Sequence, residues 1–209
     1  MTSRTSRRLA ALLATLAAAA ALGGCAPLLL GGAVVGGSMM AIDRRTSGAQ
    51  IDDQTIEVKG IKRVNDSIGD RGSVSVTSYN HIVLLTGTVT NEADKAAVER
   101  AVGAIESVRS VVNEVAIGTA ASFGNRSSDT LVTSKVKASF VDAKDLQVNA
   151  FKVVTERGVV YLMGRVTERE ANRAADIARG VSGVAKVVKV FEIVTEAELA
   201  DLQTKPAKP

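Results

Sequence analysis

Cysteine and histidine are almost absent from this sequence of 209 residues, which contains one of each, Cys25 and His81, and no tryptophan. A single cysteine cannot form an internal disulfide, and without a cluster of cysteines and histidines we expect no transition-metal site. His81 has no serine or cysteine partner in a recognisable motif, so nucleophilic catalysis is not indicated. We therefore predict a protein that is not an enzyme and that needs no cofactor or metal.

The only cysteine comes directly after an apolar run. Three arginines open the sequence, an uninterrupted series of Leu, Ala and Thr extends from Leu9 to Leu22, and Gly23-Gly24 precede Cys25. This is the three-part layout of a secretory signal, and the order Leu-Gly-Gly-Cys resembles the lipobox of bacterial lipoproteins. The resemblance implies that residues 1–24 are a signal peptide, and that the Cys25 thiol receives a diacylglycerol and becomes the first mature residue.

A membrane-spanning helix is the main alternative for this region. Residues 26–42 are also apolar, and together with the preceding run they are long enough to cross a bilayer, which takes about 20 residues. However, this second part contains four glycines and Pro27, which suit a flexible tether better than a packed helix. We therefore predict a lipidated tether over residues 25–50. Because Ala26, and not an aspartate, follows the cysteine, we expect sorting to the outer membrane.

The net charge of +4 comes mostly from the expected signal peptide. Its three arginines are not balanced by any acidic residue, so the mature chain would have 23 basic and 22 acidic side chains. A nearly neutral chain gives no reason to expect a nucleic-acid partner.

The rest of the chain contains one module twice. The stretch HIVLLTGTVTNEADKAAVERAVGAIESVRSVVNEVAI, from His81, aligns with GVVYLMGRVTEREANRAADIARGVSGVAKVVKVFEIV, from Gly158. Gly87 then falls on Gly164, and the offset is about 76 residues. We place the two copies at residues 51–118 and 128–195, with a linker at 119–127 and a disordered tail at 196–209.

Both copies predict the same elements in the same order. Apolar residues at helical spacing indicate a first helix, which we expect to begin at a capping residue, Asp53 or Asp129. An alternating strand follows, and a turn at Tyr79-Asn80 or Arg157-Gly158 leads into a second strand. An alanine-rich helix, at about 91–105 or 168–181, precedes a valine-rich last strand.

This order predicts an α+β fold made of two tandem domains. Each domain would be helix, strand, strand, helix, strand, with two helices on one face of a three-stranded mixed sheet. The glycine inside each second strand, Gly87 or Gly164, indicates a bulge or a close approach to the sheet. Each copy is near the lower size limit for a self-sufficient core, so we expect the copies to pack together. Phe123 is a candidate interface residue, and an exposed linker aromatic is the alternative.

The stretches VLLTGTVTNEADKAAVERA and VYLMGRVTEREANRAADIARGVSGV resemble the BON-domain proteins. A lipobox followed by two such domains is similar to the dual-BON outer-membrane lipoproteins. The resemblance implies a periplasmic protein without enzymatic activity, held on the outer membrane by its lipid anchor. It also implies binding of anionic phospholipids such as phosphatidylglycerol and cardiolipin, a role in outer-membrane integrity, and enrichment at the division site.

The second copy is the better candidate for lipid contact. Residues 51–118 have seven basic and ten acidic side chains, whereas residues 129–195 have eleven basic and eight acidic ones. An anionic surface would attract the second copy, although attraction between the two copies explains the asymmetry equally well. Helical spacing puts Val132, Val136 and Phe140 on the core face of its first helix. We predict lipid contact through the opposite face, at Leu131, Ser134, Lys135 and Ala138.

A protein scaffold is the alternative function. In that case the sheets or helices would bind an envelope protein, such as an outer-membrane assembly component or a regulator of wall hydrolases.

Overall fold

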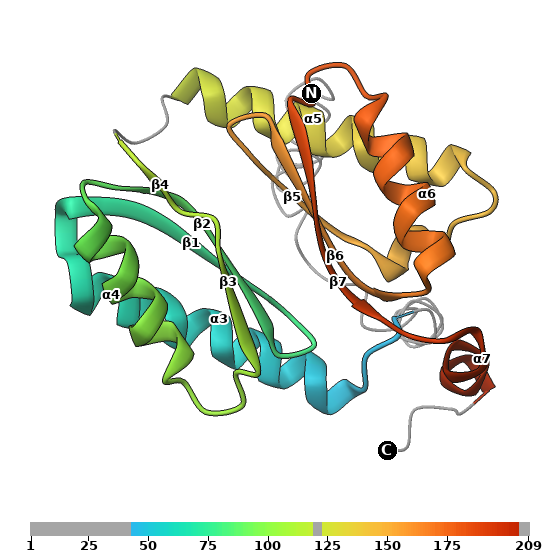
Figure 1. Cartoon of the computed structure of the whole chain (residues 1–209), viewed down its shortest axis with the longest axis horizontal. Helices are drawn as coiled ribbons and strands as arrows, with labels where there is room; N and C mark the ends of the chain where they lie inside the picture. The colour runs from blue at the N-terminus through green and yellow to red at the C-terminus, as the bar shows by residue number, and fades with distance from the viewer. Residues whose placement is uncertain (1–42, 119–122, 205–209) are drawn as a thin grey trace, which may run out of the picture. The chain divides into compact units, whose positions relative to one another are not determined.

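The computed structural model describes residues 43–118 and 123–204, which contain both predicted modules (Figure 1). The first module consists of α3 (Ser47–Ile68), β1 (Gly72–Tyr79), β2 (Ile82–Val89), α4 (Glu92–Gly103), β3 (Ser110–Asn113) and the short β4 (Ala116–Ile117). The second consists of α5 (Phe123–Asp142), β5 (Lys152–Glu156), β6 (Val159–Val166), α6 (Glu168–Arg179) and β7 (Lys186–Ile193), after which α7 (Glu196–Thr204) follows. The predicted α+β fold of two tandem domains is confirmed.

Each sheet is mixed, with the second strand of the module at its centre. β2 pairs antiparallel with β1 and parallel with β3, and β6 pairs antiparallel with β5 and parallel with β7. The parallel pairs require a crossover connection, which α4 and α6 provide. β4 pairs with the end of β2, so the first sheet has four strands where three were predicted, whereas the second has the predicted three.

The helices of each module cover one face of its sheet and form a separate core there. In the first module this core contains Ile56, Val64, Leu85, Val98 and Val102 among others. In the second, the predicted core positions Val132, Val136 and Phe140 are at most 4% exposed, and the Phe140 ring lies 5.2 Å from the ring of Phe151.

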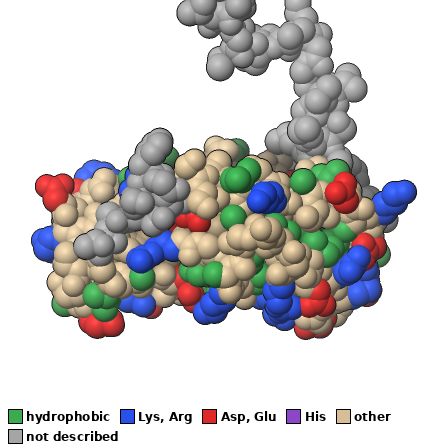
Figure 2. Space-filling view, turned by 90° about the horizontal axis from the view of Figure 1, so that it is seen from above, with side chains coloured by type: hydrophobic (Ala, Val, Ile, Leu, Met, Phe, Trp, Pro, Cys, Tyr) green, Lys and Arg blue, Asp and Glu red, His purple; other side chains and the backbone are tan. Residues whose placement is uncertain are grey.

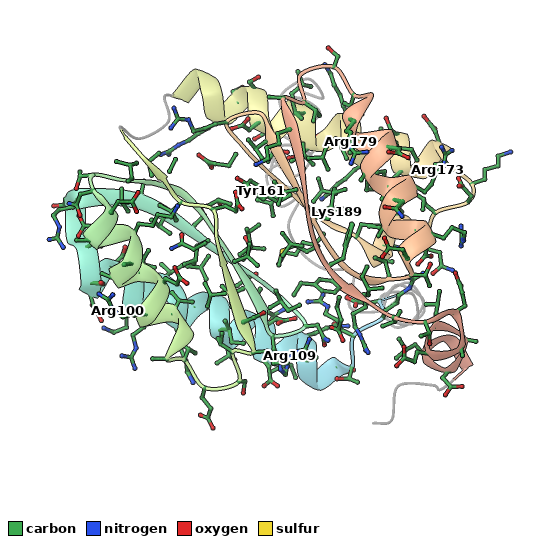
Figure 3. The ribbon with its side chains drawn as sticks, in the orientation of Figure 1. Arg100, Arg109, Tyr161, Arg173, Arg179 and Lys189 are labelled. Atoms are coloured by element: carbon green, nitrogen blue, oxygen red, sulfur yellow. The ribbon has the colours of Figure 1, made fainter. Side chains whose placement is uncertain are left out.

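The opposite faces of the two sheets pack against each other. Tyr79 and Leu84 of the first module form one buried cluster with Tyr161, Met163 and Val190 of the second, and Tyr161 is labelled among the strands in Figure 3. At its margin, Lys152 Nζ donates to Glu57 Oε1 (2.7 Å) and Asn80 Nδ2 donates to Glu192 Oε2 (2.6 Å). The expected packing of the copies is therefore confirmed. The side chain of Phe123 lies outside the described part of the structure.

Both first helices begin earlier than predicted. α3 begins at Ser47 because the Thr46 hydroxyl caps it by accepting from the Ala49 N–H (3.1 Å). α5 begins at Phe123, inside the expected linker. The prediction that Asp53 and Asp129 cap these helices is therefore wrong, because both are buried residues inside the helices.

The two aspartates hold the hairpin turns of their own modules instead. Asp129 accepts from the N–H groups of Arg157 and Gly158 at 2.7 and 2.8 Å. Asp53 accepts from the N–H groups of Asn80 and His81 at 2.7 and 2.8 Å. The first turn therefore lies at Asn80-His81, one residue beyond the predicted Tyr79-Asn80, and both of its residues have positive φ, 48° and 68°. The carboxylates stabilise backbone conformations that non-glycine residues seldom adopt.

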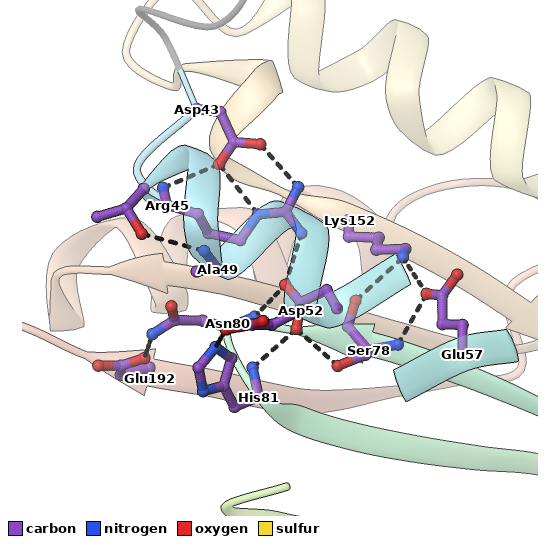
Figure 4. Close-up of polar contacts among 12 residues, drawn as sticks. Asp43, Arg45, Ala49, Asp52, Glu57, Ser78, Asn80, His81, Lys152 and Glu192 are labelled. Atoms are coloured by element: carbon purple, nitrogen blue, oxygen red, sulfur yellow. Dashed lines mark hydrogen bonds and ion pairs between the residues drawn. The ribbon is translucent and has the colours of Figure 1, made fainter. Parts of the chain in front are cut away.

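Asp53 also belongs to a wider polar network, and its partners Arg45, Ser78, Asn80 and His81 are labelled in Figure 4. Its carboxylate accepts from the Ser78 hydroxyl (2.7 Å) and from Arg45 Nη1 (2.8 Å) in addition to the turn. Burial by itself would raise the pKa of Asp53, but the hydrogen bonds, with that of His81 N–H first among them, outweigh burial and lower it.

Asp53→Asn should lower the free energy of unfolding by about 1 to 3 kcal/mol at neutral pH, because an amide leaves buried donors without an acceptor. The pKa of Asp53 is depressed in the folded state, so its contribution is complete above the unfolded value of about 4 and is lost as the pH falls through the folded pKa. The difference in free energy of unfolding between the unmodified protein and Asp53→Asn should therefore be smaller below pH 4 than at pH 7, which urea unfolding at the two pH values can measure. Asp52→Asn, whose side chain is about half exposed, is the control and should change stability by less than about 0.5 kcal/mol. Equal losses in the two variants would contradict this assignment.

The last residues of the expected tether are ordered, contrary to the predicted flexible segment 25–50. Arg44 forms an ion pair with Glu170 of α6 at 2.7 Å, and both side chains are at most 5% exposed. Arg45 pairs with Asp43 and Asp53 and lies over the Tyr79 ring, 4.4 Å from its centre. Two successive arginines thus bind different modules, which fixes the chain before α3.

The predicted disorder of residues 196–209 is also wrong for most of the segment, because Glu196–Thr204 form α7. Thr195 and Glu198 cap this helix reciprocally: the Glu198 N–H donates to the Thr195 hydroxyl (3.2 Å) and the Thr195 N–H donates to the Glu198 carboxylate (2.8 Å). Leu199 is 6% exposed and anchors α7. Residues 205–209 are not described.

Candidate membrane-contact site

The exposed face of α5 carries all four residues predicted to contact lipid. Leu131, Ser134, Lys135 and Ala138 are exposed, and 56% of Leu131 is accessible although Val132 beside it is buried. The helical repeat explains the difference, because successive residues are about 100° apart around the axis. The structure thus brings the four residues together on one face, away from the core.

Val141 extends this face and was missed by the sequence analysis. It is 65% exposed and lies ten residues after Leu131. Residues at positions i, i+3, i+7 and i+10 follow one side of a helix, so Leu131, Ser134, Ala138 and Val141 form a single line. The same spacing, continued one step further along the sequence, would have identified it.

A shallow groove of about 520 Å³ separates α5 from α6 next to this line. Lys135 and Ala138 line the groove, together with Ile177 and Val181, whereas Leu131 and Ser134 do not. Two carboxylates, Asp142 and Asp176, also line it, and Asp176 is paired with Arg179. The groove is thus mixed in charge, and Lys135 of α5 is the cation that lines it.

Lys135 and Lys137 are exposed on α5 and have no ion-pair partner among the described residues. By contrast, Arg173 and Arg179 on α6, labelled in Figure 3, pair with Asp145 and Asp176. The view from above in Figure 2 shows hydrophobic side chains interspersed with Lys and Arg side chains, without one continuous apolar patch. This pattern suits shallow contact with a charged surface better than deep insertion.

The first module has a comparable apolar line on α3 that the sequence analysis also missed. Ile51, Val58 and Ile61 are 64%, 71% and 49% exposed, at positions i, i+7 and i+10. Val58 occupies the place in α3 that Ser134 occupies in α5, given the offset of 76 residues. The acidic module thus also has exposed apolar side chains along its first helix.

A family model described as BON domain matches residues 52–119 and 128–195, which are the two modules. The chain belongs to the BON-domain family. Each of the two modules is therefore a BON domain, and the resemblance noted in the sequence is confirmed.

Three relatives match most of this chain. Outer membrane lipoprotein DolP of Haemophilus influenzae is 41% identical over 76% of this chain and 86% of its own length. The 21 kDa hemolysin of Actinobacillus pleuropneumoniae is 32% identical over 76% of this chain and 83% of its own length. Osmotically-inducible protein Y of Escherichia coli is 30% identical over 64% of this chain and 67% of its own length.

Cys25, the predicted lipidation site, lies outside the described residues. Within residues 43–118 and 123–204, no helix is both long and apolar enough to span a bilayer. The same residues contain no group of three or more His, Cys, Asp or Glu side chains arranged to hold a metal ion.

Proposed function

We propose that this protein is a lipoprotein of the outer membrane, anchored through Cys25 and facing the periplasm, whose second BON domain binds anionic phospholipid through the exposed face of α5. The observation that carries the proposal is the exposed Leu131 on a helix whose other face is core, together with Lys135 and Lys137, which have no ion-pair partner among the described residues. The lipobox and the 41% identity to Outer membrane lipoprotein DolP support the anchor and the location. A role in envelope integrity at the division site belongs to the same proposal.

The chemistry of α5 suits the interface of a bilayer. Leu131 and Val141 supply apolar side chains that enter the headgroup region, and the lysines meet lipid phosphates at about 1 kcal/mol per cation. A diacylglycerol on Cys25 has two acyl chains and can hold the protein on the bilayer by itself, so the basic surface is needed to bring the domain itself against the headgroups. The second BON domain thus provides the second contact.

A second candidate function is that of a scaffold for an envelope protein, such as an assembly component or a regulator of wall hydrolases. It is favoured by the line of Ile51, Val58 and Ile61 on the first BON domain. Between residues 51 and 118 the net charge is −3, which opposes contact with anionic lipid but not with a protein.

Leu131→Glu should reduce binding of the two-domain fragment 43–204 to vesicles that contain phosphatidylglycerol or cardiolipin by roughly ten- to hundredfold. This is the range expected when the burial of one leucine, worth about 1.5 to 3 kcal/mol, is lost. The melting temperature should hardly change, because an exposed substitution costs less than about 1 kcal/mol. Vesicle sedimentation and thermal unfolding measure the two effects.

Val58→Glu on α3 is the matched control, because it introduces the same charge at an exposed apolar residue in the first helix of the other BON domain, 71% exposed against 56% for Leu131. It should leave vesicle binding within about twofold of the unmodified fragment. Equal losses in the two variants would show that the contact is not specific to α5. If the unmodified fragment binds no vesicle of any composition, the lipid proposal fails and the scaffold is favoured.

A further inference from the structure

A polar cleft of about 320 Å³ opens where β1 and β2 of the first BON domain face α5 and β5 of the second. Hydroxyl groups dominate its walls, at Ser73, Ser75 and Thr88 on one side and at Thr130, Thr133 and Thr155 on the other. Its volume is at the lower end of the ~300 to 1,000 Å³ typical of small-molecule sites, which are mostly apolar. This cleft is polar, so its ligand must be polar as well.

Two hydroxyls on the first BON domain, those of the exposed Ser73 and Ser75, are available to a ligand. Those of Ser73, Ser75 and Thr88 make no hydrogen bond with any described residue, although Thr88 is only 2% exposed. On the opposite wall, Thr133 donates to the hydroxyl of Thr155 (2.6 Å) and Thr130 donates to a backbone carbonyl. Hydroxyls without partners on one wall and satisfied ones on the other leave one side of the cleft ready to donate and accept.

Two charged groups at the cleft also lack ion-pair partners among the described residues. Glu156 is half-buried, and burial followed by the nearby charge of Asp129 raises its pKa. Asp129 itself is occupied by the turn N–H groups of Arg157 and Gly158. Arg126 is exposed at the same cleft, and its positive charge acts to lower the pKa of Glu156. The cleft therefore presents one strong acceptor and one strong donor beside its free hydroxyls.

We propose that this cleft binds a saccharide, a function that goes beyond lipid binding and does not depend on it. A sugar carries closely spaced hydroxyls, each of which donates and accepts, and so matches a wall of free hydroxyls between a carboxylate and a guanidinium. A phosphate-type anion would be repelled by Glu156 and Asp129, and an apolar ligand would leave the hydroxyls unsatisfied. A simple amine would pair with the Glu156 carboxylate but would leave the Arg126 guanidinium without a partner.

The test is a titration of the ¹⁵N-labelled fragment 43–204, which contains both cores, with maltose and separately with N,N′-diacetylchitobiose, followed by amide NMR. We expect shifts around β1, β5 and the start of α5 with at least one of the two sugars. Glu156→Gln should weaken binding about tenfold, since a hydrogen bond to a charged group is lost, and Ser75→Ala about threefold. Preference for the acetylated sugar would assign the site to amino-sugar glycans, and preference for maltose to neutral ones.

Ser110→Ala is the control, because Ser110 is an exposed strand serine in β3 outside the cleft, and it should leave the affinity unchanged. Leu131→Glu should also bind the sugar normally, which separates this site from the membrane contact. Unchanged spectra of the variants without sugar would show that they fold. If neither sugar shifts the cleft amides at millimolar concentrations, or if Glu156→Gln binds as tightly as the unmodified fragment, the proposal is wrong.

Discussion

Gly87→Ala should destabilise the first BON domain by roughly 2 to 6 kcal/mol, the sum of about 1 to 3 for backbone strain and about 1 to 3 for overpacking. Gly87 has a φ of +115°, which L-residues rarely adopt. A Cβ added there would lie 2.1 Å from the carbonyl oxygen of Ser73, on the paired strand β1. Because both obstacles are backbone, a change of side-chain rotamer cannot relieve them.

Two other glycines separate these contributions. Gly164 is the equivalent residue of the second BON domain; a Cβ there would lie 2.4 Å from the Ala150 carbonyl oxygen, without a positive φ. Gly164→Ala should therefore cost only about 1 to 3 kcal/mol. In Gly103→Ala, the new Cβ would be 3.7 Å from Val111, an ordinary contact, and stability should not fall. Urea unfolding of the three variants measures their losses of stability, which should be largest for Gly87→Ala and smallest for Gly103→Ala. A loss of stability in Gly87→Ala no larger than in Gly103→Ala would contradict this prediction.

The close approach at these glycines shows how far the sequence could predict the fold. Periodicity and the internal repeat were sufficient to predict the order of the elements, because each copy alternates polar and apolar residues at the spacing of its own helices and strands. They also indicated that Gly87 and Gly164 mark a close approach. What comes near them, a backbone carbonyl from a strand or from the short 3-10 helix before one, depends on three-dimensional pairing.

Long-range partners account for the incorrect predictions. Asp53 and Asp129 stand near the start of an expected helix, where an aspartate is a favoured cap residue. Only the folded chain shows that they bind hairpin turns 27 to 29 residues away. Arg44 and Arg45 stand in a short polar segment without periodicity, so nothing local distinguishes them from a tether. Their partners Glu170 and Asp53 come from separate domains.

The candidate membrane site was predicted only in part, for a related reason. Leu131 was identified because it departs from the core line of Val132, Val136 and Phe140. Ile51, Val58 and Ile61 were not, because exposed apolar residues at helical spacing look like a core face in the sequence. Burial distinguishes the two, and burial depends on the sheet against which the helix packs.

The second large effect on stability is expected from a substitution of Arg44. Arg44→Met should lower the free energy of unfolding by about 3 to 5 kcal/mol at neutral pH, because it leaves the Glu170 carboxylate buried without its counter-charge. Arg44 Nη1 and Nη2 donate to the two oxygens of Glu170 at 2.7 and 2.8 Å, and Nη1 also donates to the Arg165 carbonyl at 2.9 Å. Glu170 in turn accepts from the N–H of Thr167, the residue directly before α6, so the same carboxylate caps that helix.

The pH dependence identifies the ion pair as the cause. Burial by itself would raise the pKa of Glu170, but the hydrogen bonds from Arg44 and from the Thr167 N–H outweigh burial and lower it. Its contribution to stability is therefore complete above the ordinary value of 4.5 and is lost as the pH falls through the folded pKa. In Arg44→Met the pKa of Glu170 should rise, so the gap between the two proteins should be widest at pH 7 and narrow below about pH 4.

Arg173→Met is the matched control for this prediction. It breaks an ion pair of similar length, 2.9 Å to Asp145, in the same domain, but both side chains are about half exposed, so the cost should be at most about 1 kcal/mol. Chemical unfolding of both variants at the two pH values is the measurement. A loss in Arg44→Met that matches the control, or that does not change with pH, would mean that Arg44 does not hold the chain to the second BON domain. The expected larger, acid-sensitive loss would mean that the segment leading from the lipid anchor is fixed to the domain that we propose contacts the membrane.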